Sequence, residues 1–260
     1  MTNLNKTSLF IAAIFLVFSF TQAHAVDNFS ELVDKSGRQR MLSQRIAKAY
    51  FFLNLRVRSD KAKQQLEESL LLFRKSHNEL KQAVPDKGVQ ELLEFIDVVF
   101  DEYATIAIRP FSMDNGVQML DLSETLLETS HSVVLKLESM SKTKKDQIVN
   151  ISGRQRMLSQ RIAKYYALFQ TGFRDDNSVY QLEKAVAEFD EALKQLRAEK
   201  RNTKRINYQL NRIQRLWNVV KGFFLDVKQG GLPVTVFVTT DKIMSTMNEV
   251  TGLYAKLTDK

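Results

Sequence analysis

The sequence of 260 residues has no cysteine and is poor in the two residues that break helices, with three prolines and nine glycines. The absence of cysteine excludes disulfides, thiolate metal sites and cysteine nucleophiles. The scarcity of proline and glycine favours long helices over short strands joined by tight turns. G-x-S-x-G, H-E-x-x-H and phosphate-loop motifs are also absent, and His77 and His131 have no further ligands at metal-binding spacing. We therefore expect no enzyme activity, no cofactor and no metal site, and we interpret both histidines as structural.

The N-terminal 25 residues have the pattern of a secretory signal peptide. Lys6 supplies a positive charge, residues 9–20 form an apolar run, and Ala23-His24-Ala25 is an A-x-A cleavage site. We expect cleavage after Ala25 and a periplasmic protein. The alternative is an uncleaved segment that anchors the protein to the inner membrane, but this apolar run is shorter than the roughly 17–25 residues that a span needs.

The net charge is positive but evenly spread. The whole chain carries a formal charge of +8, and because Lys6 is the only charged residue before residue 26, the remainder carries +7. Lysines and arginines alternate with acidic residues instead of forming one run, which argues against a nucleic-acid partner, as does the predicted export. A small anion, an anionic membrane surface or an acidic protein remains possible as a partner.

One stretch of thirteen residues, SGRQRMLSQRIAK, occurs twice without a change. It spans residues 36–48 and again residues 152–164, at an offset of 116. The similarity continues beyond the stretch at the same offset, for example from Phe73 to Phe189 and from Leu80 to Leu196. Such self-similarity indicates an internal duplication. We predict a signal peptide at residues 1–25, a first domain at 26–141 and a second domain at 142–260.

Apolar residues at spacings of three and four predict four amphipathic helices in each half. We expect helices from Asn28 or Ser30 to about residue 56, and then over 60–84, 89–108, 117–141, 178–199, 203–228 and 241–257. No glycine or proline separates Ser141 from the second motif, so the fourth helix is expected to continue through it as one long rod. The β-branched residues 234–239 are expected to form an extended connection. The predicted fold is all-α, with two tandem four-helix up-down bundles joined by that rod.

The motif helix has two packing faces when its residues are placed at about 100° intervals. One face contains Leu42, Ile46, Ala49 and Leu53, and we expect it to pack into its own bundle. The opposite face has the spacing of an a/d seam. In the two copies its members are Gly37, Arg40, Gln44 and Ala47, and Gly153, Arg156, Gln160 and Ala163. A helix with two packing faces needs a second partner helix.

The residues of this second face favour an anion site. Glycine within a helix costs about 1 kcal/mol against alanine but allows two backbones to approach closely. Arg40 facing Arg156 would be repulsive unless an anion lay between them, and paired guanidinium donors suit a small planar oxyanion or a carboxylate. Gln44 and Gln160 would donate further hydrogen bonds, and the remaining motif arginines would take supporting positions. These are Arg38, Arg45, Arg154 and Arg161.

Two plainer interpretations of the motif stay open at this point. Ser36 and Ser152 fit the first position of an S-x-x-Q capping box, with Gln39 and Gln155 at its last position. The glycines would then be first-turn residues without a special role. In the second interpretation, the arginines extend to solvent or pair with acidic residues on neighbouring helices.

The motif GRQRMLSQRIAK resembles the signature of the N-terminal sensor domain of type IV pilus methyl-accepting chemotaxis transducers, the PilJ family. It is similar, more distantly, to the P-box of NarX-like nitrate and nitrite sensor kinases. The resemblance implies a periplasmic four-helix bundle that holds its ligand between first helices at a two-fold interface, with one arginine from each side. The ligand-binding arginine of that family falls on Arg40 and Arg156, and its glycine falls on Gly37 and Gly153.

The resemblance implies nitrate or nitrite as the ligand, although composition does not distinguish these from another small anion. Because the motif occurs twice, the interface could form within one chain as a pseudo-dimer, or between two chains as a homodimer. Family members usually carry a transmembrane helix and an output module, and neither follows the second repeat here. We therefore expect a binding protein that presents its liganded state to a membrane-bound sensor kinase or chemotaxis transducer. The alternative is a helical adaptor that binds no ligand and docks on a pilus, chemotaxis or envelope complex.

Overall fold

The computed structural model describes the backbone of residues 7–141 and 144–257 and the side chains of residues 29–140 and 146–257. Over this part of the chain the fold is all-α, with eight α-helices, one short 3-10 helix and no strand. The helices are α1 (Thr7–Asn54), α2 (Ser59–Ala83), α3 (Lys87–Ala107), α4 (Met113–Ser141), α5 (Lys144–Gln170), α6 (Asp176–Ala198), α7 (Lys204–Leu225), η1 (Val227–Gln229) and α8 (Pro233–Ala255).

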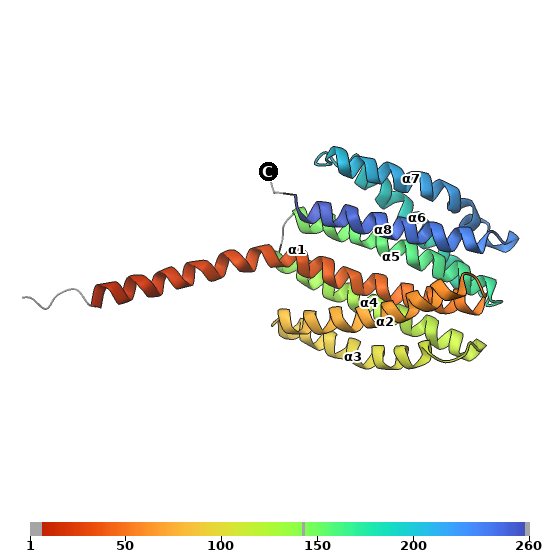
Figure 1. Cartoon of the computed structure of the whole chain (residues 1–260), viewed down its shortest axis with the longest axis horizontal. Coiled ribbons are helices and arrows are strands. Elements are labelled where there is room, and N and C mark those ends of the chain that lie inside the picture. The colour runs from red at the N-terminus through yellow and green to blue at the C-terminus, as the bar shows by residue number, and fades with distance from the viewer. Residues whose placement is uncertain (1–6, 142–143, 258–260) are drawn as a thin grey trace, which may run out of the picture.

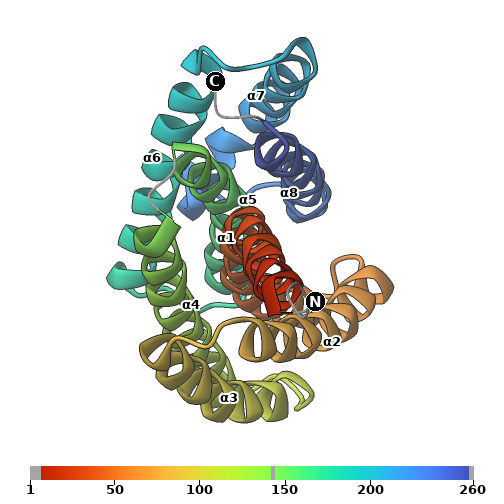
Figure 2. The same cartoon turned by 90° about the vertical axis from the view of Figure 1, so that its left-hand side faces the viewer.

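The helices form two bundles, α1 to α4 and α5 to α8, which pack against each other mainly through α1 and α5 (Figures 1 and 2). These two helices run parallel and in register. Ser30 donates a hydrogen bond to Asp146, which lies 116 residues later and is therefore its counterpart in the second repeat. The predicted fold class is thus confirmed, and the two motif helices lie side by side within a single chain.

Local signals explain where several helices begin. Asp86, Asp175 and Thr203 each accept a hydrogen bond from the backbone N–H three residues later, which caps α3, α6 and α7. Inside the bundles the repeated apolar positions are buried, and Phe73 and Phe189 are both 0% exposed. Burial of these amphipathic faces supplies most of the stability of such helices.

The predicted continuous rod between the halves is wrong. Lys164 Nζ of α5 lies 3.0 Å from Ser123 Oγ of α4. In one straight helix these residues would be separated by about 60 Å, at 1.5 Å per residue. Instead α4 ends at Ser141, α5 begins at Lys144, and the two helices run antiparallel (Figure 1). The predicted domain boundary between residues 141 and 142 adjoins residues 142–143, which lie outside the described part, and it stays a prediction.

Two other expectations about helix ends are also wrong. α1 begins at Thr7 and not at Asn28 or Ser30. Residues 234–239 are helical, because α8 begins at Pro233, which fits the first turn of a helix where its missing N–H is not needed. The side chains of Val236 and Phe237 are buried in the second bundle, and this packing outweighs the β-branched character of the segment.

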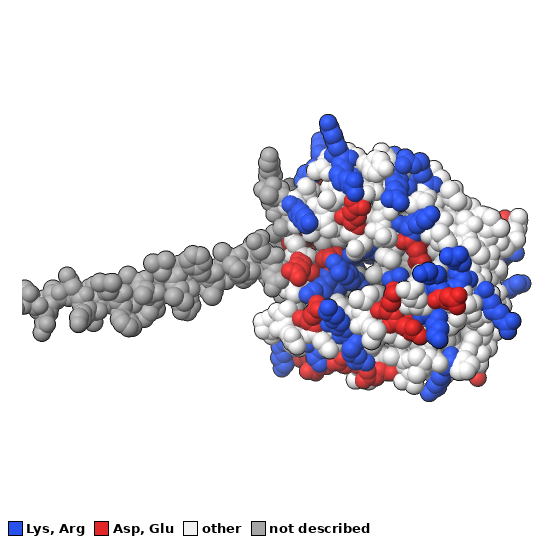
Figure 3. All heavy atoms as spheres, in the orientation of Figure 1, with Lys and Arg blue, Asp and Glu red and all other residues white. Residues whose placement is uncertain are grey.

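Basic and acidic side chains are interspersed over the face shown in Figure 3, as the sequence pattern predicts. Over the part of the chain whose side chains the structure describes, no helix is both long and apolar enough to cross a membrane.

Candidate functional site at the interface of the two repeats

Gly37, Arg40, Gly153 and Arg156 meet where α1 packs against α5, and we call these four residues the arginine seam. A Cβ atom on Gly37 would lie 3.3 Å from Arg40 Nη2 and 3.5 Å from Arg156 Nη2. A Cβ atom on Gly153 would lie 3.1 Å from Arg156 Nη2 and 3.9 Å from Arg40 Nη2. Both guanidinium groups therefore occupy the space that the absent glycine side chains leave. The structure thus brings together the four residues that the sequence placed on one face, while their contact with a ligand stays a prediction.

The capping-box interpretation of the motif is wrong. Ser36 and Ser152 lie well inside α1 and α5, and their hydroxyls donate to the carbonyl oxygens of Val33 at 3.1 Å and Val149 at 3.0 Å. The glycines that follow them are therefore mid-helix residues. The absence of a side chain at each glycine leaves room for the guanidinium groups, at the helix-propensity penalty of about 1 kcal/mol that glycine carries against alanine.

Arg40 is 1% exposed and is held by neutral groups. Its Nη1 lies 3.1 Å from His131 Nδ1, and its Nη2 donates to Asn150 Oδ1 at 2.8 Å. Asn150 in turn donates to Glu138 Oε2 at 2.7 Å. Within the described part of the chain, no carboxylate forms an ion pair with Arg40. Burial, together with the charges of Arg154 and Arg156, lowers the pKa of Arg40 to about 9, so the group stays charged at neutral pH.

Arg156 is fully buried and has a carboxylate partner. Its Nη2 forms an ion pair with Asp34 Oδ1 at 2.7 Å, and its Nη1 donates to Asn248 Oδ1 at 2.8 Å. Asp34 also accepts a hydrogen bond from Arg38 Nη2 at 3.0 Å. Burial lowers the pKa of Arg156, and the charge of Asp34 opposes that decrease. One carboxylate is thus shared by a buried arginine and by Arg38, which is half exposed.

The two sides of the seam differ at one pair of equivalent positions. Asn150 stands 116 residues after Asp34, so the two residues have the same place in the two repeats. Each contacts the buried arginine of the opposite repeat, but only Asp34 brings a negative charge. In addition, the Nε atoms of Arg40 and Arg156 are both buried and have no hydrogen-bond partner among the residues that the structure describes. The seam therefore contains two buried cations, and Asp34 forms an ion pair with one of them, Arg156.

The predicted glutamines lie beside the seam with their amide nitrogens already engaged. Gln44 Nε2 donates to the carbonyl oxygen of Ser123 on α4 at 2.8 Å, and Gln160 Nε2 donates to that of Thr240 on α8 at 3.3 Å. These bonds tie each motif helix to another helix of its own bundle. Contact of Gln44 and Gln160 with a ligand stays a prediction, whereas their packing role is visible.

The last residue of the motif, missed by the sequence analysis, forms buried ion pairs between the repeats. Lys48 Nζ lies 2.5 Å from Asp241 Oδ1 on α8, and Lys164 Nζ lies 2.5 Å from Glu124 Oε1 on α4. Both lysines are 0% exposed. The sequence could have indicated this position, because Lys48 and Lys164 follow Gln44 and Gln160 by four residues and therefore lie on the same side of the helix.

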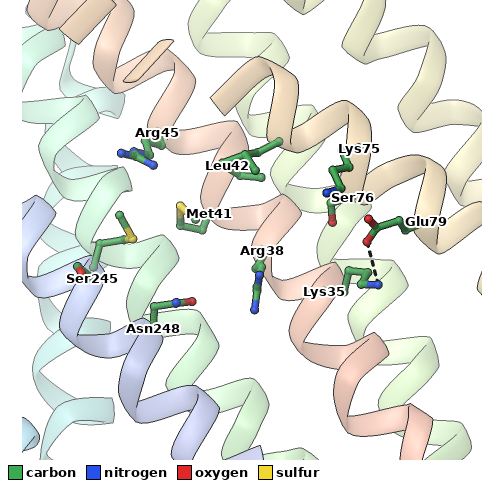
Figure 4. A pocket seen from close by; sticks show the side chains of 12 residues that line it. Lys35, Arg38, Met41, Leu42, Arg45, Lys75, Ser76, Glu79, Ser245 and Asn248 are labelled. Atoms are coloured by element: carbon green, nitrogen blue, oxygen red, sulfur yellow. Dashed lines mark ion pairs between the residues drawn. The ribbon is translucent and has the colours of Figure 1, made fainter. Parts of the chain in front are cut away.

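The four supporting arginines line two clefts that flank the seam. Arg38 and Arg45 line a cleft between α1, α2 and α8, which we call the first cleft (Figure 4). Arg154 and Arg161 line its counterpart beside α4, α5 and α6, the second cleft, to which Arg40 and His131 also contribute. Arg154 pairs with Glu188 and Arg161 with Glu124, so the acidic-partner interpretation holds for these two, as it does for Arg156 with Asp34.

Four residues of the site were not identified from the sequence. These are Asp34, His131, Asn150 and Asn248, and each contacts the guanidinium of Arg40 or Arg156. His131 stands alone in the sequence and was interpreted as structural, but burial and the neighbouring Arg40 lower its pKa to about 4, so it faces the arginine as a neutral acceptor. Among the described residues, no group of three histidine, aspartate or glutamate side chains could hold a metal ion.

Substitution of Gly153 tests the close packing of the seam. Gly→Ala within a helix normally stabilises it by about 1 kcal/mol. At Gly153 the new methyl group would lie 3.1 Å from Arg156 Nη2, which Asp34 and Asn248 hold in place. We therefore expect Gly153→Ala to leave the melting temperature unchanged or lower. Gly222→Ala on α7 is the matched control, because nothing lies within 4 Å of its Cβ position and it is expected to gain the full increment. Equal stabilisation of both variants in thermal unfolding would show that the seam tolerates a Cβ atom.

The described part of the chain is thus an all-helical protein with two four-helix repeats and a buried arginine of each repeat at their interface. Comparison with family models assigns it to a family. The PilJ family, the N-terminal part of type IV pili methyl-accepting chemotaxis transducers, matches residues 23–107 and again residues 139–232. The chain belongs to this family and contains two tandem segments of it. Searches of curated proteins and of solved structures gave no match. The family is one of signalling sensors and not of enzymes.

Proposed function

We propose that this protein is a periplasmic sensor of a small anion, with nitrate and nitrite as the first candidates, and that the arginine seam is its binding site. The observation that carries the proposal is the charge of the seam. Two fully buried guanidinium groups share the space above Gly37 and Gly153, and among the described residues only Asp34 forms an ion pair with either of them. Burial of an unpaired charge is unfavourable, so an anion between the two groups would stabilise the folded protein.

The donors at the seam favour a small oxyanion. Guanidinium presents its N–H groups in one plane and pairs with planar oxyanions through two bonds at once. The Nε atoms of Arg40 and Arg156 have unused donors, and Asn150 and His131 already surround Arg40 with groups that can reorient. Access is available from the second cleft, a cavity of about 240 Å³ that Arg40 lines. A large ligand would not fit between two helices that pack this closely.

Ligand binding at the seam would change a contact between the repeats. Arg156 of α5 holds Asp34 of α1, and an anion would take the place of this carboxylate. Asp34 would then remain with Arg38 on its own helix, to which it is already bonded. At this position α1 and α5 would then be held together by the anion and no longer by the ion pair of Arg156 with Asp34. We propose that a membrane-bound chemotaxis transducer or sensor kinase reads this change, in keeping with the family to which the chain belongs.

Calorimetry and thermal unfolding with nitrate, nitrite, formate and a chloride control test the proposal. We expect nitrate or nitrite to raise the melting temperature above the chloride control. Arg40→Gln and Arg156→Gln are each expected to weaken binding by roughly tenfold or more, because a charge-assisted hydrogen bond contributes about 1.5–3 kcal/mol. Arg205→Gln is the control, since Arg205 is 61% exposed on α7.

Two results would count against the anion site. In the first, no anion of the panel stabilises the protein beyond chloride. In the second, the nitrate response persists in the Arg40→Gln, Arg156→Gln double variant. Either result would favour the adaptor function, in which the seam only packs the two repeats together. Detection of the mature N-terminus at Val26 in a periplasmic fraction would test the proposed location separately.

A further inference from the structure

The first cleft differs from the seam in size and lining. It has a volume of about 400 Å³, within the range of about 300–1,000 Å³ typical of small-molecule sites. Its charged lining residues are Lys35, Arg38, Arg45, Lys75 and Glu79 (Figure 4). Its apolar lining residues are Met41, Leu42, Leu72 and Met244. The cleft therefore combines an excess of positive charge with an apolar surface.

The duplication supplies an internal comparison, because the second cleft is built from the equivalent helices. Glu188 of the second cleft is replaced by Leu72 in the first, at the offset of 116. On α4 and α8 the offset is 117, as shown by Gln44 and Gln160, which bond to Ser123 and Thr240. At this offset Glu128 of the second cleft is replaced by Ser245 in the first. The first cleft thus lacks two acidic residues that the second one has.

Arg45 differs from its counterpart in the second repeat, because it has no ion-pair partner within the described part of the chain. Its counterpart Arg161 forms an ion pair with Glu124. The residue equivalent to Glu124 is Asp241, whose shorter side chain is engaged by Lys48 and by Gln65. Within the described part of the chain, neither Arg45 nor Lys75 forms an ion pair, and Arg45 Nε is buried without a hydrogen-bond partner.

We propose that the first cleft is a second ligand site, which takes an organic anion with an apolar body. The carboxylate of the ligand pairs with Arg45, and its carbon chain lies on Met41, Leu42 and Leu72. This ligand class follows from the lining, since a bare inorganic ion would leave the apolar surface in contact with water. The second cleft does not bind such a ligand, because Glu124 and Glu188 already neutralise its arginines.

The position of the cleft also connects it to the seam. Asn248 lines the first cleft (Figure 4). It also accepts a hydrogen bond from Arg156 Nη1 at 2.8 Å. An occupant that contacts Asn248 therefore contacts a residue that holds one of the two seam arginines. The proposal itself stands on the cleft alone and does not depend on anion binding at the seam.

Titration of the protein with hexanoate, followed by calorimetry, tests this site. Acetate carries the charged head alone, and hexanamide carries the same body without the charge. We expect one hexanoate per chain, bound roughly tenfold more tightly than either comparison compound. Ser245→Glu restores the acidic residue of the second cleft, and Arg45→Gln removes the cation. Both are expected to weaken hexanoate binding by roughly tenfold.

The reciprocal change Glu128→Ser in the second cleft is the matched control and is expected to leave hexanoate binding unchanged. Ser245 and Glu128 are both exposed, so neither substitution disturbs the core. Equal affinity for hexanoate and hexanamide, an unaltered affinity in Ser245→Glu, or no saturable binding would each overturn the proposal. Nitrate titration of the same samples distinguishes the two sites, because Ser245→Glu changes the first cleft and leaves all four seam residues unchanged.

Discussion

Asp34→Asn is expected to raise the affinity of the seam for nitrate by roughly tenfold. Asp34 occupies Arg156 at 2.7 Å, so a ligand has to compete with a carboxylate that is part of the protein. Asparagine keeps the shape and an acceptor oxygen, as Asn150 already does for Arg40 at 2.8 Å, but it removes the competing charge. In anion-free buffer the same variant is expected to be less stable than the parent, because Arg156 then lacks its ion pair. Calorimetric titration and thermal unfolding measure the two effects.

The reciprocal variant Asn150→Asp is expected to act in the opposite direction. It places a carboxylate on Arg40, which forms no ion pair within the described residues, and so should weaken nitrate binding by roughly tenfold or more. The new carboxylate would also lie beside Glu138, so the measurement is repeated in the Glu138→Gln background. Asp114→Asn on the exposed surface controls for the net-charge change of Asp34→Asn, and the exposed Asn207→Asp controls for that of Asn150→Asp. Equal nitrate affinity in the parent, Asp34→Asn and Asn150→Asp would remove Asp34 and Asn150 from the site.

Lys48→Met is expected to give the largest loss of stability among single substitutions at the repeat interface. The lysine is 0% exposed and pairs with Asp241 across the two repeats. Removal of one member of a buried ion pair typically costs about 3–5 kcal/mol. In a chain of this size that corresponds to a decrease of roughly 10 °C in melting temperature. Thermal unfolding followed by circular dichroism measures the decrease.

The second member of this pair provides the control for the Lys48 prediction. Lys48→Met combined with Asp241→Asn removes both charges, and the double variant is expected to recover much of the lost stability. Lys194→Met, at an exposed position of α6, is expected to change the melting temperature little. An unchanged melting temperature in Lys48→Met would mean that this pair does not hold the repeats together.

The duplication permits an asymmetry that a homodimer cannot have. In a two-fold dimer of one chain every substitution appears on both sides of the interface. Here the first repeat carries Asp34 and the second carries Asn150 at the same place. One buried arginine is therefore neutralised, and the other is held by an amide. The clefts have diverged in the same way, through the exchanges of Glu188 for Leu72 and of Glu128 for Ser245.

The all-α fold and the composition of the seam could be predicted because both depend on helical periodicity. Residues at spacings of three and four share a face whatever the tertiary structure, so Gly37 and Arg40 were placed together before any contact was known. The antiparallel arrangement of α4 and α5 could not be predicted in this way. No helix-breaking residue marks it, and the fold-back is favoured by packing of the seam face of α5 against α1, which is a long-range interaction.

The partners of Arg40 and Arg156 could not be predicted from sequence periodicity, for a similar reason. His131 lies 91 residues from Arg40, and Asn248 lies 92 residues from Arg156. Neither belongs to the motif, and only the packing of α4 and α8 brings them to it. The sequence alone shows that Asp34 and Asn150 are equivalent positions at the offset of 116. The consequence of the difference could not be predicted from it, because each side chain contacts the arginine of the opposite repeat.

A crystal structure of the protein grown with nitrate tests the central claim most directly. The account predicts one nitrate per chain between the guanidinium groups of Arg40 and Arg156, with Asp34 released from Arg156 and retained by Arg38. Nitrate absent from the seam at saturating concentration, with the contact between Arg156 and Asp34 intact, would contradict it.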